Sequence, residues 1–187
     1  MEQQPILTVR GLSKSFPGVR ALDHVDFDLR AGEVHVLVGE NGAGKSTLAK
    51  CILGMYQPEE GEIVLRGEKL CFSSPKDGIA HGIVAVYQEL TMVPYLNAAQ
   101  NIFLNREPLI RGTGMINHRN MQRDAKAILA TLGCADIDTR IPVKLLDVAQ
   151  QQMIEIAKAL SFKPQIIVLD EPTASLSERE IEPFFQQ

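Results

Sequence analysis

Eight consecutive residues carry the pattern that a phosphate-binding loop requires, and a threonine follows them. The pattern G-x-x-x-x-G-K-[ST] is matched by Gly39, Glu40, Asn41, Gly42, Ala43, Gly44, Lys45 and Ser46, and Thr47 comes next. Glycine lets the backbone approach a polyphosphate closely and adopt unusual dihedral angles that turn N–H groups toward it. Lys45 adds a compact charge for the β- and γ-phosphates, and the Ser46 hydroxyl can ligate Mg²⁺. The segment therefore predicts a site for ATP or a similar nucleotide with Mg²⁺.

The residues on either side predict the strand and helix that such a loop connects. Residues 34–38 form a nearly continuous apolar run, which is typical of a strand covered on both faces. A helix-like stretch begins at Lys45 and ends near Gly54. Its first N–H groups and its positive dipole end would point toward the same anion. This context favours a P-loop over a chance glycine-rich turn.

A second motif supplies two carboxylates far downstream. Residues 166–169 form a short apolar run that predicts a buried strand, and Asp170 and Glu171 follow it. Asp170 could hold Mg²⁺ directly or through water, and Glu171 could polarise an attacking water as general base. The alternative is an ordinary strand that ends in a solvated acidic turn. The presence of a P-loop in the same chain favours the metal-binding and catalytic interpretation.

Gln88 is a weaker candidate. It follows an apolar run at 83–87, which also predicts a strand. A neutral amide at this place could reach Mg²⁺ or the attacking water when the site closes. Spacing alone favours a solvated glutamine at a strand end.

The remaining pattern predicts an α/β core interrupted by helices. Strands are expected at 6–10 and 25–29, with a hairpin edge at 63–67. Apolar residues at helical spacing predict amphipathic helices at 119–132 and 150–161, the second burying Met153, Ile156, Ala157 and Leu160. A largely helical block at 94–162 therefore interrupts the core.

Composition limits the class of protein. The 187 residues suggest one domain, and 45% hydrophobic with 22% charged residues is an ordinary globular balance. A net charge of −4 implies no general attraction to nucleic acid or anionic lipid, although it leaves room for a local basic patch. The three cysteines lie far apart, which argues against a disulfide framework or a zinc site. No apolar stretch approaches the about 20 residues that span a bilayer.

Together these motifs resemble the ABC ATPase family. The resemblance implies that Gln88 is the Q-loop residue, that Asp170 and Glu171 form Walker B with the catalytic glutamate, and that 174–177 is the D-loop. It implies that Phe16 stacks on adenine, with a core phenylalanine as the alternative. It also places the signature, Leu-Ser-Gly-Gly-Gln in the family, at 146–150, so that the nucleotide-contacting residues would include Asp147, Val148, Ala149 and Gln150.

Residues 88–94, 101–104 and 148–160 are similar to the tandem-domain ATPases of bacterial importers for ribose, galactose and xylose. This resemblance implies an ATP-hydrolysing subunit that powers monosaccharide import. It implies a P-loop NTPase (RecA-like) parallel sheet core with an antiparallel β subdomain in 1–93. An inserted α-helical subdomain would occupy 94–162, and the chain would return to the core in 163–187. We expect the last core strands to be missing, through C-terminal truncation.

The resemblance also implies the partners. These are a second ATPase domain, integral membrane permease subunits and, indirectly, a periplasmic sugar-binding protein, with no nucleic acid. The expected location is cytoplasmic, peripheral on the inner face of the cell membrane.

Four substitutions relative to the family pattern affect these expectations. Asp147 replaces the signature serine, and a carboxylate facing a γ-phosphate repels it where a hydroxyl would donate. Val148 and Ala149 replace glycines, and Ser177 replaces the D-loop aspartate. We therefore predict that the site completed by this signature is weakened or hydrolyses slowly. The alternatives are a nucleotide-binding module with little or no hydrolysis, a soluble ABC ATPase not linked to transport, and a small-molecule P-loop kinase.

Overall fold

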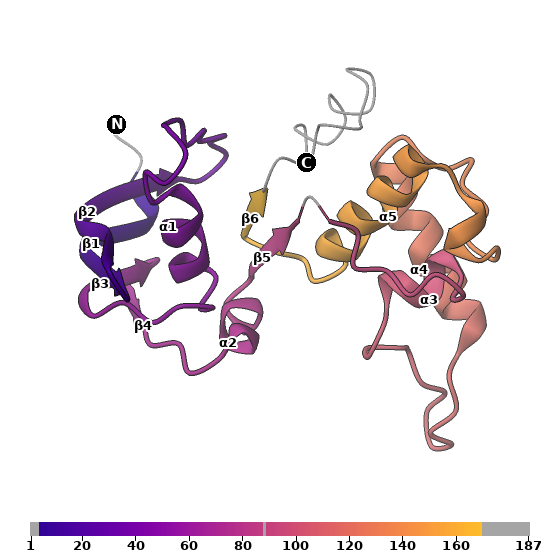
Figure 1. Cartoon of the computed structure of the whole chain (residues 1–187). Helices are drawn as coiled ribbons and strands as arrows, with labels where there is room; N and C mark the ends of the chain where they lie inside the picture. Colours follow the sequence, from indigo (N-terminus) through magenta and orange to yellow (C-terminus); the bar gives the residue numbers. More distant parts are fainter. Residues whose placement is uncertain (1–3, 88, 170–187) are drawn as a thin grey trace. The chain divides into compact units, whose positions relative to one another are not determined.

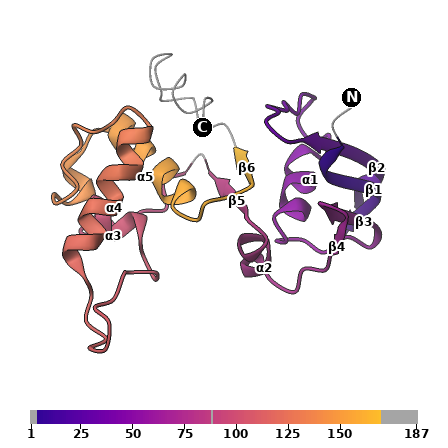
Figure 2. The same cartoon turned by 180° about the vertical axis from the view of Figure 1, so that it is seen from behind.

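The computed structural model describes residues 4–87 and 89–169. The chain divides into two compact units, residues 1–83 and 84–187 (Figures 1 and 2). The first unit contains a four-stranded antiparallel sheet and the P-loop sequence. The second contains the two longest helices and the signature sequence.

The first unit is built on an antiparallel sheet with the order β2-β1-β3-β4. Val9 lies opposite both Phe27 and Ile63, so β1 is the strand shared by the two longer pairings. The strands expected at 6–10, 25–29 and 63–65 are confirmed, although β3 is internal and the short β4 forms the edge. The four strands are β1 (Pro5–Phe16), β2 (Val19–Arg30), β3 (Glu60–Leu65) and β4 (Glu68–Leu70).

Two helices complete this unit. The helix predicted after the P-loop is α1 (Lys45–Ile52), which buries Leu48, Cys51 and Ile52. The second helix, α2 (Pro75–Ala80), begins with a capping box between Ser74 and Asp77. The Asp77 carboxylate accepts from the backbone N–H groups of Ser73 (2.6 Å) and Ser74 (2.8 Å), and these bonds lower its pKa. The sheet face and α1 share a core of Leu7, Val9, Leu12, Leu22, Leu48, Cys51, Ile52, Ile63, Leu65 and Leu70.

The buried strand predicted at 34–38 is wrong for this structure. These residues form no helix or strand, and Val36 and Val38 are 72% and 88% exposed. A strand buried on both faces needs a hydrogen-bonded neighbour on each side and side chains above and below. Within the described residues no strand pairs with this segment. Without such neighbours the apolar pattern alone does not produce a strand.

The second unit packs helices around one long core. The strands predicted at 83–87 and 166–169 are confirmed, and they pair with each other, which the sequence did not predict. The first of them starts at Ile83, the last residue of the first unit, and its other residues belong to the second. Between the two strands lie two helices expected from sequence, α4 and α5, and two further elements that the periodicity did not indicate, α3 and a 3-10 turn. The elements are β5 (Ile83–Val86), α3 (Ala98–Ile102), α4 (His118–Thr131), the 3-10 turn (Val143–Leu145), α5 (Val148–Leu160) and β6 (Ile166–Leu169).

The helix α4 buries the predicted face, with Met121, Ala125 and Leu129 in the core. For α5 the prediction of a single buried face is too narrow. Residues 152–157 and Ala159 of α5 are buried, and they include the polar Gln152 and Glu155. Leu160, which was predicted to be buried, is only partly buried. The reason is that α5 contacts both α3 and α4 and also the segment that follows β5.

Buried polar side chains hold that segment in place. Asn101 on α3 is 1% exposed, and its side-chain oxygen accepts from the Val93 N–H (2.8 Å). Its amide group donates to the carbonyl oxygens of Val93, Leu96 and Asn97 at 3.1 to 3.2 Å. The segment itself is largely exposed, and the buried Asn101 amide pairs with its inward-facing backbone groups, so they are not left unsatisfied. In the part of the chain that is described, no helix has the length and apolar character to cross a membrane.

Candidate functional site

The P-loop sequence forms the turn that leads into α1. Gly44 is the residue that caps this helix, with φ +90° and ψ 0°, and its carbonyl oxygen accepts from the Leu48 N–H (2.9 Å). No side chain caps the helix start. The first N–H groups of α1 are therefore available to an external acceptor, which is the property that makes a helix N-terminus an anion site.

Gly44 cannot be replaced by a residue with a side chain without rearrangement. A Cβ at this position would collide with the carbonyl oxygen of Ala21 and lie 3.0 Å from Leu22 Cδ2. The positive φ adds a second reason, since side chains disfavour this region. The close approach anchors the loop on β2, so the antiparallel sheet sets the position of the helix start.

Gly42 is required for a different reason. Its φ is +85°, but a Cβ there would meet nothing within 4 Å. The turn is closed by a hydrogen bond from the Ala43 N–H to the Glu40 carbonyl oxygen (3.2 Å). Space beside Gly42 is thus left open on the exposed side of the loop, where a phosphate group could approach the backbone.

Lys45 folds back over this loop. Its Nζ donates to the carbonyl oxygens of Gly39 (2.7 Å) and Glu40 (2.8 Å). Among the described residues no carboxylate lies within ion-pair distance of this ammonium. The positive charge is held over the loop by neutral oxygens and is not neutralised, so the site favours a negatively charged ligand.

The other residues of the motif lie at the surface. Glu40, Asn41 and Ser46 are exposed, and Thr47 is half-buried in the first turn of α1. Within the described ranges the Ser46 hydroxyl has no side-chain hydrogen bond to another protein group. It is therefore available to a metal ion or to solvent. The position predicted to share that ion, Asp170, lies outside the described residues.

Phe16 ends β1 on the hairpin whose second strand touches the P-loop. Its ring is half-buried and meets Tyr56 edge to face, with centroids 5.2 Å apart. Lys14 Nζ lies 5.7 Å from the ring centroid. Phe16 is thus not part of the fully buried core, and part of its surface remains open. Stacking on adenine stays a prediction.

In the second unit the signature residues begin α5. Asp147 caps the helix: its Oδ1 accepts from the Gln150 N–H (2.8 Å), and the Gln150 side chain accepts from the Asp147 N–H (3.3 Å). Val148 is 60% exposed, and Ala149 and Gln150 are half-buried. The carboxylate that replaces the family serine therefore has a structural role, because Asp and Ser are both preferred at this position.

Sequence reasoning missed the side chains that join α5 to the segment after β5. Glu155 is 8% exposed, and its Oε1 accepts from both the backbone N–H (2.5 Å) and the hydroxyl (2.7 Å) of Thr91. Lys158 Nζ donates to the Thr91 hydroxyl (2.9 Å) and lies 3.5 Å from Glu155 Oε2. A charged residue on an otherwise apolar face of α5 was the only signal of this contact.

Several predicted residues cannot be placed. Gln88, Asp170 and Glu171 lie outside the described residues, as does the D-loop at 174–177. The P-loop belongs to the first unit and the signature to the second. The described structure therefore contains two separate groups of predicted site residues, the P-loop in the first unit and the signature in the second.

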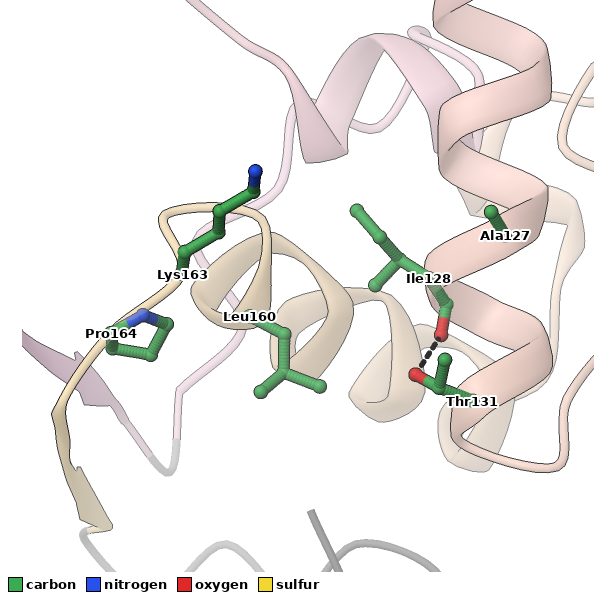
Figure 3. Close-up of a pocket in the computed structure, with 6 residues that line it drawn as sticks. All are labelled: Ala127, Ile128, Thr131, Leu160, Lys163 and Pro164. Atoms are coloured by element: carbon green, nitrogen blue, oxygen red, sulfur yellow. Dashed lines mark hydrogen bonds between the residues drawn. The ribbon is translucent and has the colours of Figure 1, made fainter.

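One shallow groove of about 340 Å³ lies in the second unit, between α4 and the end of α5 (Figure 3). In Figure 3 the Lys163 amine and Pro164 lie on the α5 side, and Thr131 donates to the Ile128 carbonyl oxygen (2.8 Å) on α4. No predicted site residue lines it. Its lining is Ala127, Ile128, Thr131, Leu160, Lys163 and Pro164.

Solved structures similar to this chain share its fold. The ADP conformation of MJ1267, described as an ATP-binding cassette of an ABC transporter, superposes with a TM-score of 0.81 at 25% sequence identity. The match covers 98% of this chain and 75% of that one. The likeness confirms the P-loop NTPase fold class.

Curated relatives are closer in sequence. A putative ribose/galactose/methyl galactoside import ATP-binding protein of Agrobacterium fabrum is 49% identical over 99% of this chain, which spans 36% of that protein. The ribose import ATP-binding protein RbsA 1 of Streptomyces avermitilis is 48% identical over 96% of the chain and 34% of its own length. The chain thus spans about a third of the length of these relatives.

The family profile described as ABC transporter matches residues 22–174. That range begins in β2, includes the P-loop and the signature helix, and ends after Glu171. The chain therefore belongs to the ABC transporter family.

Proposed function

We propose that this chain binds ATP with Mg²⁺ and forms part of the ATP-hydrolysing subunit of a monosaccharide importer. The observation that carries nucleotide binding is the Lys45 ammonium, which has no ion-pair partner among the described residues. It lies over a loop with two positive-φ glycines, at a helix start that no side chain caps. These are the groups that recognise a polyphosphate: a point charge, approachable backbone N–H groups and a helix dipole.

In this proposal each residue of the loop has one task. Gly42 leaves room for the phosphates, Gly44 fixes the loop on β2, and Lys45 neutralises the β- and γ-phosphates. Mg²⁺ would add charge neutralisation between the phosphates, held by the Ser46 hydroxyl together with Asp170. Glu171 would act as general base, Gln88 would complete the site on closure, and Phe16 would stack on the adenine ring.

The role in transport rests on the relatives. Proteins named as ribose and galactose import ATP-binding proteins are 47–49% identical to this chain over 96–99% of the chain's length, which is 34–36% of their own length. We therefore infer membrane permease subunits as partners, with a second ATPase domain and, indirectly, a periplasmic sugar-binding protein. The chain would act on the cytoplasmic face of the membrane, bound through the permease.

Calorimetry with Mg-ATP tests nucleotide binding, and the chain offers a matched pair of variants. Gly42 and Gly67 have φ values of +85° and +83°, and a Cβ at either would meet nothing within 4 Å. Gly42→Ala and Gly67→Ala, made separately, should therefore lower the free energy of unfolding by the same amount, about 1 kcal/mol. Of these two variants only Gly42→Ala should weaken ATP binding. Lys45→Ala should abolish ATP binding. If the unaltered protein and the three variants bind ATP with equal affinity, the proposed site is refuted.

Phosphate release by the full-length protein tests hydrolysis. A Glu171→Gln form should bind ATP but release phosphate far more slowly, since the amide cannot accept the proton from water. Binding without turnover in both proteins would support the nucleotide-binding module instead. Co-purification with RNA in place of a membrane subunit would support a soluble ABC ATPase.

A further inference from the structure

The segment between α3 and α4 forms a hairpin that extends away from the helices (Figure 1). Leu109 pairs with Ile116 in an antiparallel bridge, and the Ile110 N–H donates to the Met115 carbonyl oxygen (2.7 Å). At its base the Asn117 N–H donates to the Pro108 carbonyl oxygen (2.6 Å). These bonds give the hairpin a defined shape.

The hairpin presents apolar side chains to solvent. Leu109 and Met115 are 59% and 60% exposed, and Ile110 and Ile116 are exposed as well. Every residue from 109 to 116 is exposed. Four large apolar side chains on one exposed, ordered hairpin indicate a surface that docks on a protein or a membrane.

The charge around these side chains is positive, although the whole chain carries −4. Residues 105–119 contain three arginines and one glutamate. Arg106 is engaged by Ile102 and Ser161, but the described residues offer no ion-pair partner to Arg111 or Arg119, both of which are exposed. The hairpin therefore combines apolar side chains with the unpaired cation of Arg111, and Arg119 adds a second one at the start of α4 next to its base.

We propose that the hairpin at 108–117 docks on the headgroup region of an anionic lipid bilayer. Its apolar tip would enter the boundary between headgroups and acyl chains, while Arg111 and Arg119 pair with anionic headgroups. The size of the tip favours a lipid surface over a protein, because a stable protein interface takes about 20 to 30 residues a side. The proposal goes beyond nucleotide binding and does not depend on it.

Sedimentation of the full-length protein with lipid vesicles tests the proposal. Binding to phosphatidylcholine vesicles that contain phosphatidylglycerol should exceed binding to pure phosphatidylcholine vesicles and should weaken as salt is added. Arg111→Gln should reduce the affinity about fivefold. Leu109→Ser with Met115→Ser should reduce it about tenfold or more. Val19→Ser is the matched control, because Val19 is 58% exposed on a hairpin of the first unit.

Far-ultraviolet circular dichroism of the same preparations shows that each variant is folded. The heat of Mg-ATP binding separates the two proposals, since vesicle binding without ATP binding would refute the proposed function alone. The docking proposal is overturned if the protein ignores vesicles, binds both lipid mixtures equally, or is unaffected by the hairpin variants. It is also overturned if the hairpin variants lose only a membrane protein partner, because the hairpin would then be a protein interface.

Discussion

Removing the Glu155 carboxylate should destabilise the helical unit more than removing any exposed carboxylate does. Three interactions end on this side chain: the Thr91 N–H, the Thr91 hydroxyl and the Lys158 ammonium. Hydrogen bonds to charged groups contribute about 1.5–3 kcal/mol each, but neighbouring contributions are not additive. Lys158 would keep its bond to the Thr91 hydroxyl, which limits the loss. We therefore expect Glu155→Ala to lower the free energy of unfolding by about 3 kcal/mol.

A second variant of Glu155 separates the contribution of the hydrogen bonds from that of the charge, and a variant of an exposed carboxylate serves as the control. Glu155→Gln retains an oxygen that accepts both Thr91 bonds and loses only the ion pair, so it should cost about 1 kcal/mol. Asp124→Ala is the control within the same unit. Asp124 pairs with Arg123 at 2.8 Å, but the side chains are 42% and 70% exposed, so the loss should stay within about 0.5 kcal/mol.

Urea unfolding followed by far-ultraviolet circular dichroism gives the stabilities, since the sequence contains no tryptophan for fluorescence. Amide hydrogen exchange supplies the local measurement. The Thr91 N–H should lose protection in Glu155→Ala, partly retain it in Glu155→Gln, and remain unaffected in Asp124→Ala. If Glu155→Ala shifts the urea midpoint no more than Asp124→Ala, or leaves Thr91 protected, the contact does not stabilise the unit as argued.

Three further predictions follow from single contacts. Asp147→Ser should leave α5 as stable as before, because both residues cap helices, and it should raise phosphate release by the assembled full-length protein. Asp147→Ala should lower the free energy of unfolding by about 1 kcal/mol. Burial raises the pKa of Cys51 to about 11, so at pH 8 a thiol reagent should label the exposed Cys71 first and Cys51 only after unfolding. The Ser73 and Ser74 N–H groups lower the pKa of Asp77 below 3.8, so its stabilisation is complete above that value and is lost as the pH falls through the folded pKa. The stability of the first unit should decline less steeply below about pH 4 in Asp77→Asn, as measured by urea unfolding across that range.

Local signals in the sequence identified most of the elements. The P-loop motif predicted both the turn and the start of α1, because glycine and lysine at that spacing have few other uses. Helical spacing of apolar residues located α4 and α5. Two short helices were missed although their starts carry capping boxes, Ser74 with Asp77 and Asn97 with Gln100. A search for that pattern would have indicated both.

Long-range contacts explain what the sequence could not show. The apolar run at 34–38 has the composition of a buried strand, but burial depends on neighbours supplied from elsewhere in the fold. The pairing of Glu155 with Thr91 joins residues 64 positions apart, and no periodicity in either segment points to the other. The contact of Arg106 with Phe162 is likewise invisible in the sequence. The guanidinium lies 3.5 Å from the centroid of the Phe162 ring, and burial lowers the pKa of Arg106.

Asp147 shows why a helix start alone does not reveal function. A cap needs a short side chain with an acceptor oxygen, and serine and aspartate meet that need almost equally. The hydrogen bond to the Gln150 N–H therefore accounts for either residue. A phosphate distinguishes them, because a hydroxyl can donate to it and a carboxylate repels it. Replacing serine by aspartate should thus preserve α5, and if the signature contacts a nucleotide as the family resemblance predicts, it changes the charge at that contact, so hydrolysis and not stability would reveal its effect.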